Sequence, residues 1–183
     1  QAVSRGLGDV YKRQNIHLKA QSFPGLVLLK LDGDLGEGSQ VGISIKERGG
    51  DSSLFYSNVD CVLNKNAKLD LYDITLPSQW TRHNLNVDLL DVGAETNLRG
   101  LYLNHKDYFC DHHTNINHFS KHTQSYEDYR GLLSGSSKAV FNGKINIVEK
   151  AFKSNSELIN KNLMLSNSCD VNTKPELTID NDD

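Results

Sequence analysis

Residues 130–183 read RGLLSGSSKAVFNGKINIVEKAFKSNSELINKNLMLSNSCDVNTKPELTIDNDD, and three short apolar runs lie in this segment between Asn, Gly and Ser. The runs are at 145–147, 163–165 and 177–179, and in each of them the apolar residues alternate, as on a strand with one buried face. The runs return after eighteen and then fourteen positions, with no long helix between them. This spacing is typical of a coil of stacked rungs.

The same segment carries a resemblance to a known family. The strings KAVFNGKINIVEKAFKSN, NKNLMLSNS and TKPELTIDNDD, in this order, resemble the core of the SufB/SufD family, the scaffold subunits of the SUF iron–sulfur cluster assembly system. A looser match extends back to about Trp80. The KPEL string at 174–177 and the acidic pair at 182–183 favour the SufD branch of the family.

Length and charge limit the possible classes of protein. The 183 residues suffice for one domain with a sizeable core. The net charge of −3 and the pI of about 6.2 give no general attraction to nucleic acid or to an anionic membrane. No apolar run approaches the roughly 18 residues of a membrane span. The three cysteines, Cys61, Cys110 and Cys169, are odd in number and far apart, which favours a reducing cytoplasm over a disulfide framework.

Both ends of the chain look unnatural. Residues 1–14, QAVSRGLGDVYKRQ, resemble a translated sequencing-adapter string, so we expect a non-native leader there and a core domain over 15–183. The chain stops inside a motif-like string, so we expect this domain to be incomplete at its C-terminal end. The predicted fold is all-β, a right-handed parallel β-helix truncated at both ends, and the resemblance implies the same fold.

In the N-terminal part the pattern predicts strands at 26–31 and 41–45 with a turn at 32–38, where Asp and Gly favour tight backbone conformations. Asp32, Asp34 and Glu37 in this turn could be calcium ligands. Their spacing lacks the EF-hand pattern, so a solvated turn is the preferred interpretation.

Two similar units, NKNAKLDLYDI and DVGAETNLRGLYL, place Ala67 and Ala94 twenty-seven positions apart. A small residue at each corner would suit stacked rungs, and we expect the following strand to alternate through Leu69, Leu71 and Ile74. Residues 151–165 fit either a short helix or a strand, and the resemblance favours a strand.

The window CDHHTNINHFSKH at 110–122 is the richest in metal-ligating residue types. Its candidate ligands are Cys110, His112, His113 and His118, because thiolate and imidazole bind zinc and iron. His118 and His122 would share one face of a helix, whereas a strand would place His112 and His113 on opposite faces. The spacing matches no zinc motif, so we expect an exposed rung of hydrogen-bonded polar residues and no bound metal. Tyr126 and Tyr129, which follow, are expected to cover the coil.

No catalytic constellation is visible in the sequence. It contains neither a Walker A string nor a Gly-x-Ser-x-Gly elbow, so we expect a protein that is not an enzyme. Two other classes stay open. One is a β-helix carbohydrate-active enzyme, such as a polysaccharide lyase, and the other is a direct metal-binding protein that uses Cys110 and its neighbouring histidines.

The resemblance implies a role as a scaffold for iron–sulfur cluster assembly. In the family, the SufD-type subunit pairs with SufB through the β-helix, and the SufC ATPase attaches through a helical C-terminal domain, so ATPase activity would belong to SufC. The nascent cluster is expected at the SufB–SufD interface, and its associated histidine lies in a Cys-x-His-Gly segment beyond Asp183. We therefore expect no cofactor bound by this segment itself. The residues expected near the partner interface are Lys174, Pro175, Leu177, Ile179, Asp182 and Asp183.

Overall fold

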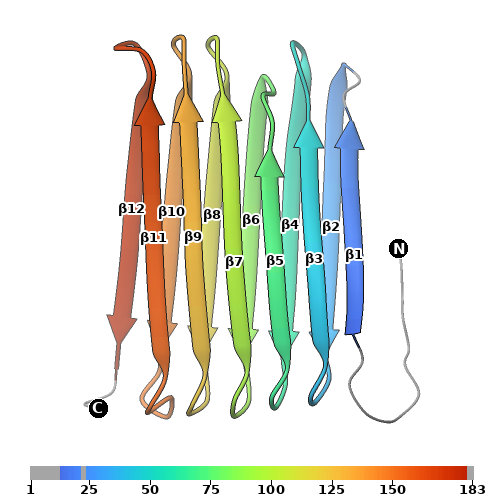
Figure 1. Ribbon diagram of the computed structural model, residues 1–183, viewed down its shortest axis with the longest axis vertical. Coiled ribbons are helices and arrows are strands. Elements are labelled where there is room, and N and C mark those ends of the chain that lie inside the picture. The colour runs from blue at the N-terminus through green and yellow to red at the C-terminus, as the bar shows by residue number, and fades with distance from the viewer. Residues whose placement is uncertain (1–12, 22–23, 181–183) are drawn as a thin grey trace.

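The computed structural model describes residues 13–21 and 24–180, and every regular element in this part of the chain is a β-strand (Figure 1). No helix long and apolar enough to cross a membrane occurs among these residues. The strands have eight to eleven residues each. They are β1 (Arg13–Gln21), β2 (Gly25–Leu35), β3 (Gln40–Arg48), β4 (Ser53–Leu63), β5 (Lys68–Thr75), β6 (Trp80–Leu89), β7 (Glu95–Asn104), β8 (Phe109–His118), β9 (Gln124–Leu133), β10 (Lys138–Ile147), β11 (Asn155–Met164) and β12 (Asp170–Ile179).

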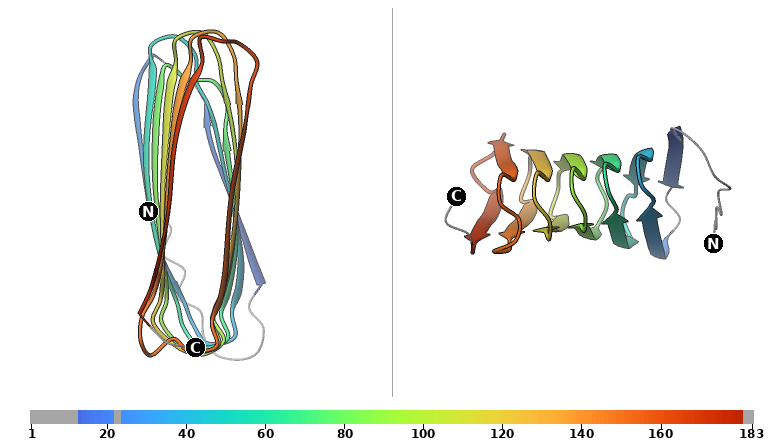
Figure 2. Two further views of the ribbon diagram at one scale, coloured as in Figure 1. Left: turned by 90° about the vertical axis from the view of Figure 1, so that its left-hand side faces the viewer. Right: turned by 90° about the horizontal axis from the view of Figure 1, so that it is seen from below.

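The strands form two parallel sheets of six strands, with the odd-numbered strands in one sheet and the even-numbered strands in the other. In Figure 1 the odd strands run upward in front, the even strands run downward behind, and each turn steps to the left, so the coil is right-handed. Figure 2 (left) looks along the coil and shows two long sheets joined by tight turns. The prediction of an all-β, right-handed parallel β-helix is confirmed.

The unequal spacing of the apolar runs reflects half-turns of the coil. Residues stacked on successive turns are 26 positions apart at Asp60 and Asn86 and 32 apart at Ile145 and Leu177. The runs at 145–147 and 177–179 therefore lie on β10 and β12 of one sheet. The run between them begins in β11 of the other sheet, which also confirms a strand in the segment that fitted either helix or strand.

Small residues occupy the corners before the odd strands, as expected for Ala67 and Ala94, which are both fully buried. The Ala67 carbonyl accepts a hydrogen bond from the N–H of Glu95 on the next turn (2.9 Å), and the Ala94 carbonyl accepts one from Gln124 (3.0 Å). The residue before each of these corners has a positive φ, which reverses the chain direction. These residues are Gly38, Asn66, Gly93, His122 and Lys153.

The interior consists of files of side chains that stack from turn to turn. One file contains, on successive turns, Leu63, Leu89, His118 and Ile147. Each fully buried Leu or Ile contributes about 1.5–3 kcal/mol through removal of its apolar surface from water. The presence of His118 shows that the interior also contains polar residues.

The turn expected at 32–38 is shorter than predicted. β2 continues through Leu35, and the turn consists of residues 36–39, with Gly38 at positive φ. The reason is that Asp32 and Asp34 face outward on β2. They alternate with Leu31, Gly33 and Leu35, which face inward. An outward position of a strand can hold an acid because it is exposed to solvent. Residue types that favour turns therefore do not by themselves end the strand.

The calcium interpretation of this segment finds no support in the side-chain contacts. Asp34 accepts a hydrogen bond from Asn64 (2.8 Å), and Glu37 forms an ion pair with Lys65 (2.8 Å). The two carboxylates are engaged by different partners on the following turn and do not converge.

Candidate functional site

The His-rich window forms β8, and strand alternation divides it between the inside and the outside of the coil. Cys110, His112 and His118 face the interior and are almost fully buried, while His113 faces outward. The prediction that a strand would separate His112 from His113 is confirmed. The expectation of an exposed polar rung is wrong for the inward half, because a coil buries one face of every strand whatever residues that face carries.

The metal-ligand candidates of this window do not form one site. His118 is saturated by hydroxyl groups, with Nδ1 2.8 Å from Thr123 Oγ1 and Nε2 2.9 Å from Ser125 Oγ. It lies six residues from His112, which is roughly 20 Å along a strand. Burial lowers the pKa of His118 to about 4 and raises the pKa of the Cys110 thiol to about 12, so both are held neutral.

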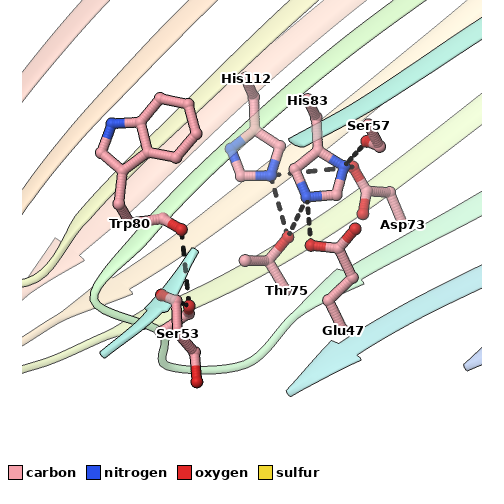
Figure 3. A network of polar contacts seen from close by, with 9 residues as sticks. Glu47, Ser53, Ser57, Asp73, Thr75, Trp80, His83 and His112 are labelled. Atoms are coloured by element: carbon pink, nitrogen blue, oxygen red, sulfur yellow. Dashed lines mark hydrogen bonds and ion pairs between the residues drawn. The ribbon is translucent and has the colours of Figure 1, made fainter. Parts of the chain in front are cut away.

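His112 instead belongs to a polar cluster inside the coil, which both sheets build (Figure 3). Three of its residues are register neighbours on β4, β6 and β8, and the other three come from β3 and β5 of the opposite sheet. None of the six is more than 4% exposed. We define the polar cluster as Glu47, Ser57, Asp73, Thr75, His83 and His112.

His83 lies at the centre of the polar cluster. Its Nε2 is 3.0 Å from Glu47 Oε2, and its Nδ1 is 2.8 Å from Ser57 Oγ and 3.5 Å from Asp73 Oδ2. The imidazole is therefore placed between two carboxylates from the facing sheet. This arrangement satisfies a charged ring that would otherwise be costly to bury.

His112 lies on the other side of the cluster. Its Nε2 is 3.1 Å from Thr75 Oγ1 and 3.7 Å from Asp73 Oδ2. Its ring stacks on that of His83, with the centroids 4.8 Å apart and the planes at 7°, and on the ring of Tyr102 at 5.0 Å. The ring of His112 thus has two stacked aromatic neighbours.

Two tyrosines close the cluster on the C-terminal side, and each needs a glycine beside it. A Cβ on Gly100 would overlap the ring of Tyr129, and a Cβ on Gly131 would overlap the ring of Tyr102. Tyr129, expected to cover the outside, is instead fully buried, with its ring centroid 5.7 Å from that of His112. The expectation is wrong because Tyr129 has the inward parity of β9.

Burial and mutual charge set the protonation of the cluster. Burial raises the pKa of Asp73 to about 6, partly offset by His83. Burial disfavours a charge on His83, but Asp73 and Glu47 outweigh it and raise the pKa of His83 to about 9. Burial, reinforced by the charges of His83 and His113, lowers the pKa of His112 well below its ordinary value. At neutral pH His83 carries the charge and His112 is a neutral ring.

One part of the cluster has a metal-ligand composition. One donor atom each from Asp73, His83 and His112 can be chosen so that all three lie within 4.8 Å of one another. Of the sequence candidates, only His112 is part of this group. Two imidazoles and a carboxylate are a donor set that zinc and iron accept.

The outer face of the even-numbered sheet carries ladders of Asn and Asp. Asn86 donates to Asp60 on the preceding turn (2.7 Å), and Asn117 donates to Asp88 (2.8 Å). Asp111, on the same face, pairs with Arg82 at 2.6 Å. Each of these acids is thus engaged by a partner on a neighbouring turn.

The residues expected near a partner interface lie on β12, except that Asp182 and Asp183 are outside the described residues. Leu177 and Ile179 have the inward parity of the coil, yet they are 58% and 52% exposed, since β12 is the last strand of its sheet. Lys174 faces outward and pairs with Glu176. Pro175 lies opposite Gly143 of β10 and removes one backbone donor from the strand edge.

Sequence reasoning does not find Glu47, Asp73 or His83. Each of them stands two positions from an apolar residue with inward parity, as Asp73 does from Leu71. Extending the alternation by one step would have placed all three inside. The prediction that the buried alternation of Leu69 and Leu71 continues at Ile74 is wrong. Ile74 is an odd number of positions away, so it faces outward.

Fold and interior together define the class: a right-handed parallel β-helix with a polar cluster enclosed between its two sheets. Residues 29–183 match the family model described as SUF system FeS cluster assembly, SufBD core domain, and the chain therefore belongs to this family. The resemblance seen in the C-terminal strings is thereby confirmed.

Two curated relatives agree with this assignment. The chain is 28% identical over 128 residues to the iron-sulfur cluster assembly protein SufD of Escherichia coli (strain K12), covering 70% of this chain and 30% of that protein. It is 28% identical over 145 residues to the iron-sulfur cluster assembly SufBD family protein slr0076 of Synechocystis sp., covering 79% and 32%. The chain spans about a third of the length of these relatives.

Proposed function

We propose that this chain is a non-catalytic scaffold for iron–sulfur cluster assembly that pairs with a SufB subunit. The family match over residues 29–183 supports the assembly role. The burial of the polar cluster supports a scaffold over an enzyme, because His83 and His112 are at most 4% exposed and lie out of reach of a large substrate.

The proposed pairing rests on the exposed edge of the last described turn of the coil. Within the described part of the chain, β11 pairs only with β9 and β12 only with β10, so each strand has one edge free. Free backbone edges beside apolar side chains are the features that strand-to-strand association uses. The large apolar residues exposed there are Leu163, Met164, Leu165, Leu177 and Ile179, with exposed fractions of 52–60%.

Charge near this edge favours a different partner over a second copy. Glu176 on β12 is paired with Lys174, but Asp180 follows the strand directly and the acidic pair at 182–183 follows in the sequence. Two copies meeting at this edge would bring like charges together, whereas a partner with basic residues at the matching positions would not. Pairing with SufB in place of self-association is the outcome that we propose.

The remaining parts of the proposal follow from the family resemblance. The SufC ATPase attaches through a helical domain, and the described residues contain only strands. ATP hydrolysis then belongs to SufC, and the cluster is cargo held transiently between SufB and its partner. The place of action is the cytoplasm.

Separate pull-downs with the cognate SufB and SufC test this proposal. We expect the chain to retain SufB and not SufC. Replacing both Leu177 and Ile179 with Asp should reduce SufB retention at least tenfold, because the contact face becomes charged. Leu101→Asp is the matched control, since Leu101 is 41% exposed in the middle of the coil and should leave retention unchanged.

Two results would contradict the proposal. Retention of SufC without SufB would show that the binding surface is placed wrongly. An equal loss of SufB with Leu101→Asp and with the paired substitution would show that the last turn has no special role. Circular dichroism of each variant confirms that the coil is still folded.

A further inference from the structure

The polar cluster gathers metal-ligating groups that are far apart in the sequence. Asp73 reaches the interior from β5 in one sheet, and His83 and His112 reach it from β6 and β8 in the other (Figure 3). Asp73 Oδ2 is 3.5 Å from His83 Nδ1 and 3.7 Å from His112 Nε2. Ligands bound to one ion at about 2.0–2.1 Å are roughly 3.4 Å apart in a tetrahedral site, which is close to these two separations.

Three buried polar atoms of the cluster have no hydrogen-bond partner among the described residues, namely Glu47 Oε2, Asp73 Oδ1 and His112 Nδ1. An unsatisfied buried oxygen is costly, and native interiors rarely contain one without a reason. A cation beside Asp73 would satisfy its Oδ1.

We propose that the coil interior binds one divalent transition-metal ion, of the Zn²⁺ or Fe²⁺ type, through Asp73, His83 Nδ1 and His112 Nε2. Two imidazole nitrogens and a carboxylate oxygen form a three-protein-ligand set that leaves a further position open. The site is distinct from the assembled cluster, which is cargo, and it does not depend on the proposed pairing with SufB.

Glu47 completes the arrangement without binding the ion. Its Oε2 forms an ion pair with His83 Nε2 at 3.0 Å, on the ring whose Nδ1 faces Asp73. A carboxylate in this place fixes the tautomer and orientation of a metal-bound histidine. Glu47 is therefore a positioning residue. With Asp73 it also supplies two negative charges to balance a divalent ion.

Binding requires one rearrangement. The rings of His83 and His112 are parallel to within 7°, and an ion must lie near the plane of each ring that binds it. We expect the ring of His112 to turn about its Cβ–Cγ bond, which would break its contact with Thr75. Because the site is enclosed, we expect the ion to enter as the coil folds, and to link the two sheets.

The test is to refold the whole chain from denaturant with EDTA, with Zn²⁺ or with Co²⁺, and to remove unbound metal before elemental analysis. We expect one ion per chain, a visible Co²⁺ ligand-field spectrum, and a rise in the unfolding midpoint on the order of 8 °C for a tightly bound ion. Asp73→Asn and His112→Gln should each lower metal content at least tenfold. His113→Gln, the outward neighbour on β8, is the matched control and should retain the ion.

Less than about one ion per ten chains after refolding with either metal would overturn the proposal, as would unchanged metal content in Asp73→Asn. If the variants fail to fold, X-ray absorption of the unmutated Zn²⁺ form gives the answer. Nitrogen and oxygen ligands with two imidazoles support the site. Sulfur in the ligand shell would overturn it and point to the buried Cys61 or Cys110.

Discussion

Ile145 and Leu177 are neighbours in one interior file, directly stacked between β10 and β12, yet their burial differs sharply. Ile145 is 2% exposed and Leu177 is 58% exposed. Both residues have the same parity on their strands, so the difference is due to the neighbouring turns alone. In this file the inward side chain is buried where a turn lies on each side of it and exposed on the last strand.

The same contrast applies to polar residues. His83 lies between Ser57 and His112 in its file and between the two sheets, and it is 4% exposed. Charged groups can be enclosed in the middle turns because the facing sheet supplies partners such as Glu47. The last described turn has no such enclosure, and its inward apolar residues such as Leu177 are exposed.

The largest expected effect is the difference in free energy of unfolding between substitutions at Ile145 and at Leu177. Ile145→Ala should lower the free energy of unfolding by about 2–5 kcal/mol, because it removes buried methyl groups and leaves a cavity. Leu177→Ala should change it by about 0.5 kcal/mol or less, as surface substitutions do. Denaturant unfolding of both variants gives the two values. Equal losses would mean that the last turn is covered in solution.

A pH series on Glu127 is expected to have the next largest effect. This residue is fully buried on β9, and burial raises its pKa from 4.5 to about 7, slightly offset by Thr114 across the interior. Its register neighbours are Leu98 and Leu158, and Tyr129 is the titratable group whose pKa it influences.

A raised carboxyl pKa means that the folded chain prefers protonated Glu127. The contribution of Glu127 to stability should therefore be largest below about pH 4.5, fall as the pH rises to about 7, and then level off, with a total loss of about 3 kcal/mol. Glu127→Gln should remove this part of the pH dependence. Glu157→Gln, an exposed glutamate on β11, should leave it in place. A wild-type-like slope in Glu127→Gln would refute the assignment.

The smallest effect on stability is expected for an ion pair on the outer surface of the coil. Lys65 and Glu37 form an exposed ion pair at 2.8 Å between successive turns. Lys65→Ala should leave the denaturation midpoint unchanged within error, because exposed pairs are screened by water and salt. A clear loss of stability would indicate that these surface contacts between turns hold the coil together as the interior files do.

The candidate site could be predicted only in part. His112 stands out in the sequence because it lies among other histidines, whereas Asp73 and His83 each stand alone in ordinary strand patterns. His118 looked equivalent to His112 but is saturated by Thr123 and Ser125. Composition marks a window rich in ligand types, and it does not say which side chains have unsatisfied lone pairs.

Alternation along one strand is a local property of extended backbone, so the sequence alone determined the all-strand character, inward residues such as Leu69 and Leu71, and the small corner residues Ala67 and Ala94. Family membership was also readable from three strings near the C-terminus. Only the tertiary structure decided that Asp73 faces His83 and His112, because that depends on the lengths of the turns between strands and on the facing sheet. Burial of a given inward residue was likewise decided by the turns stacked on either side of it, which no single strand encodes.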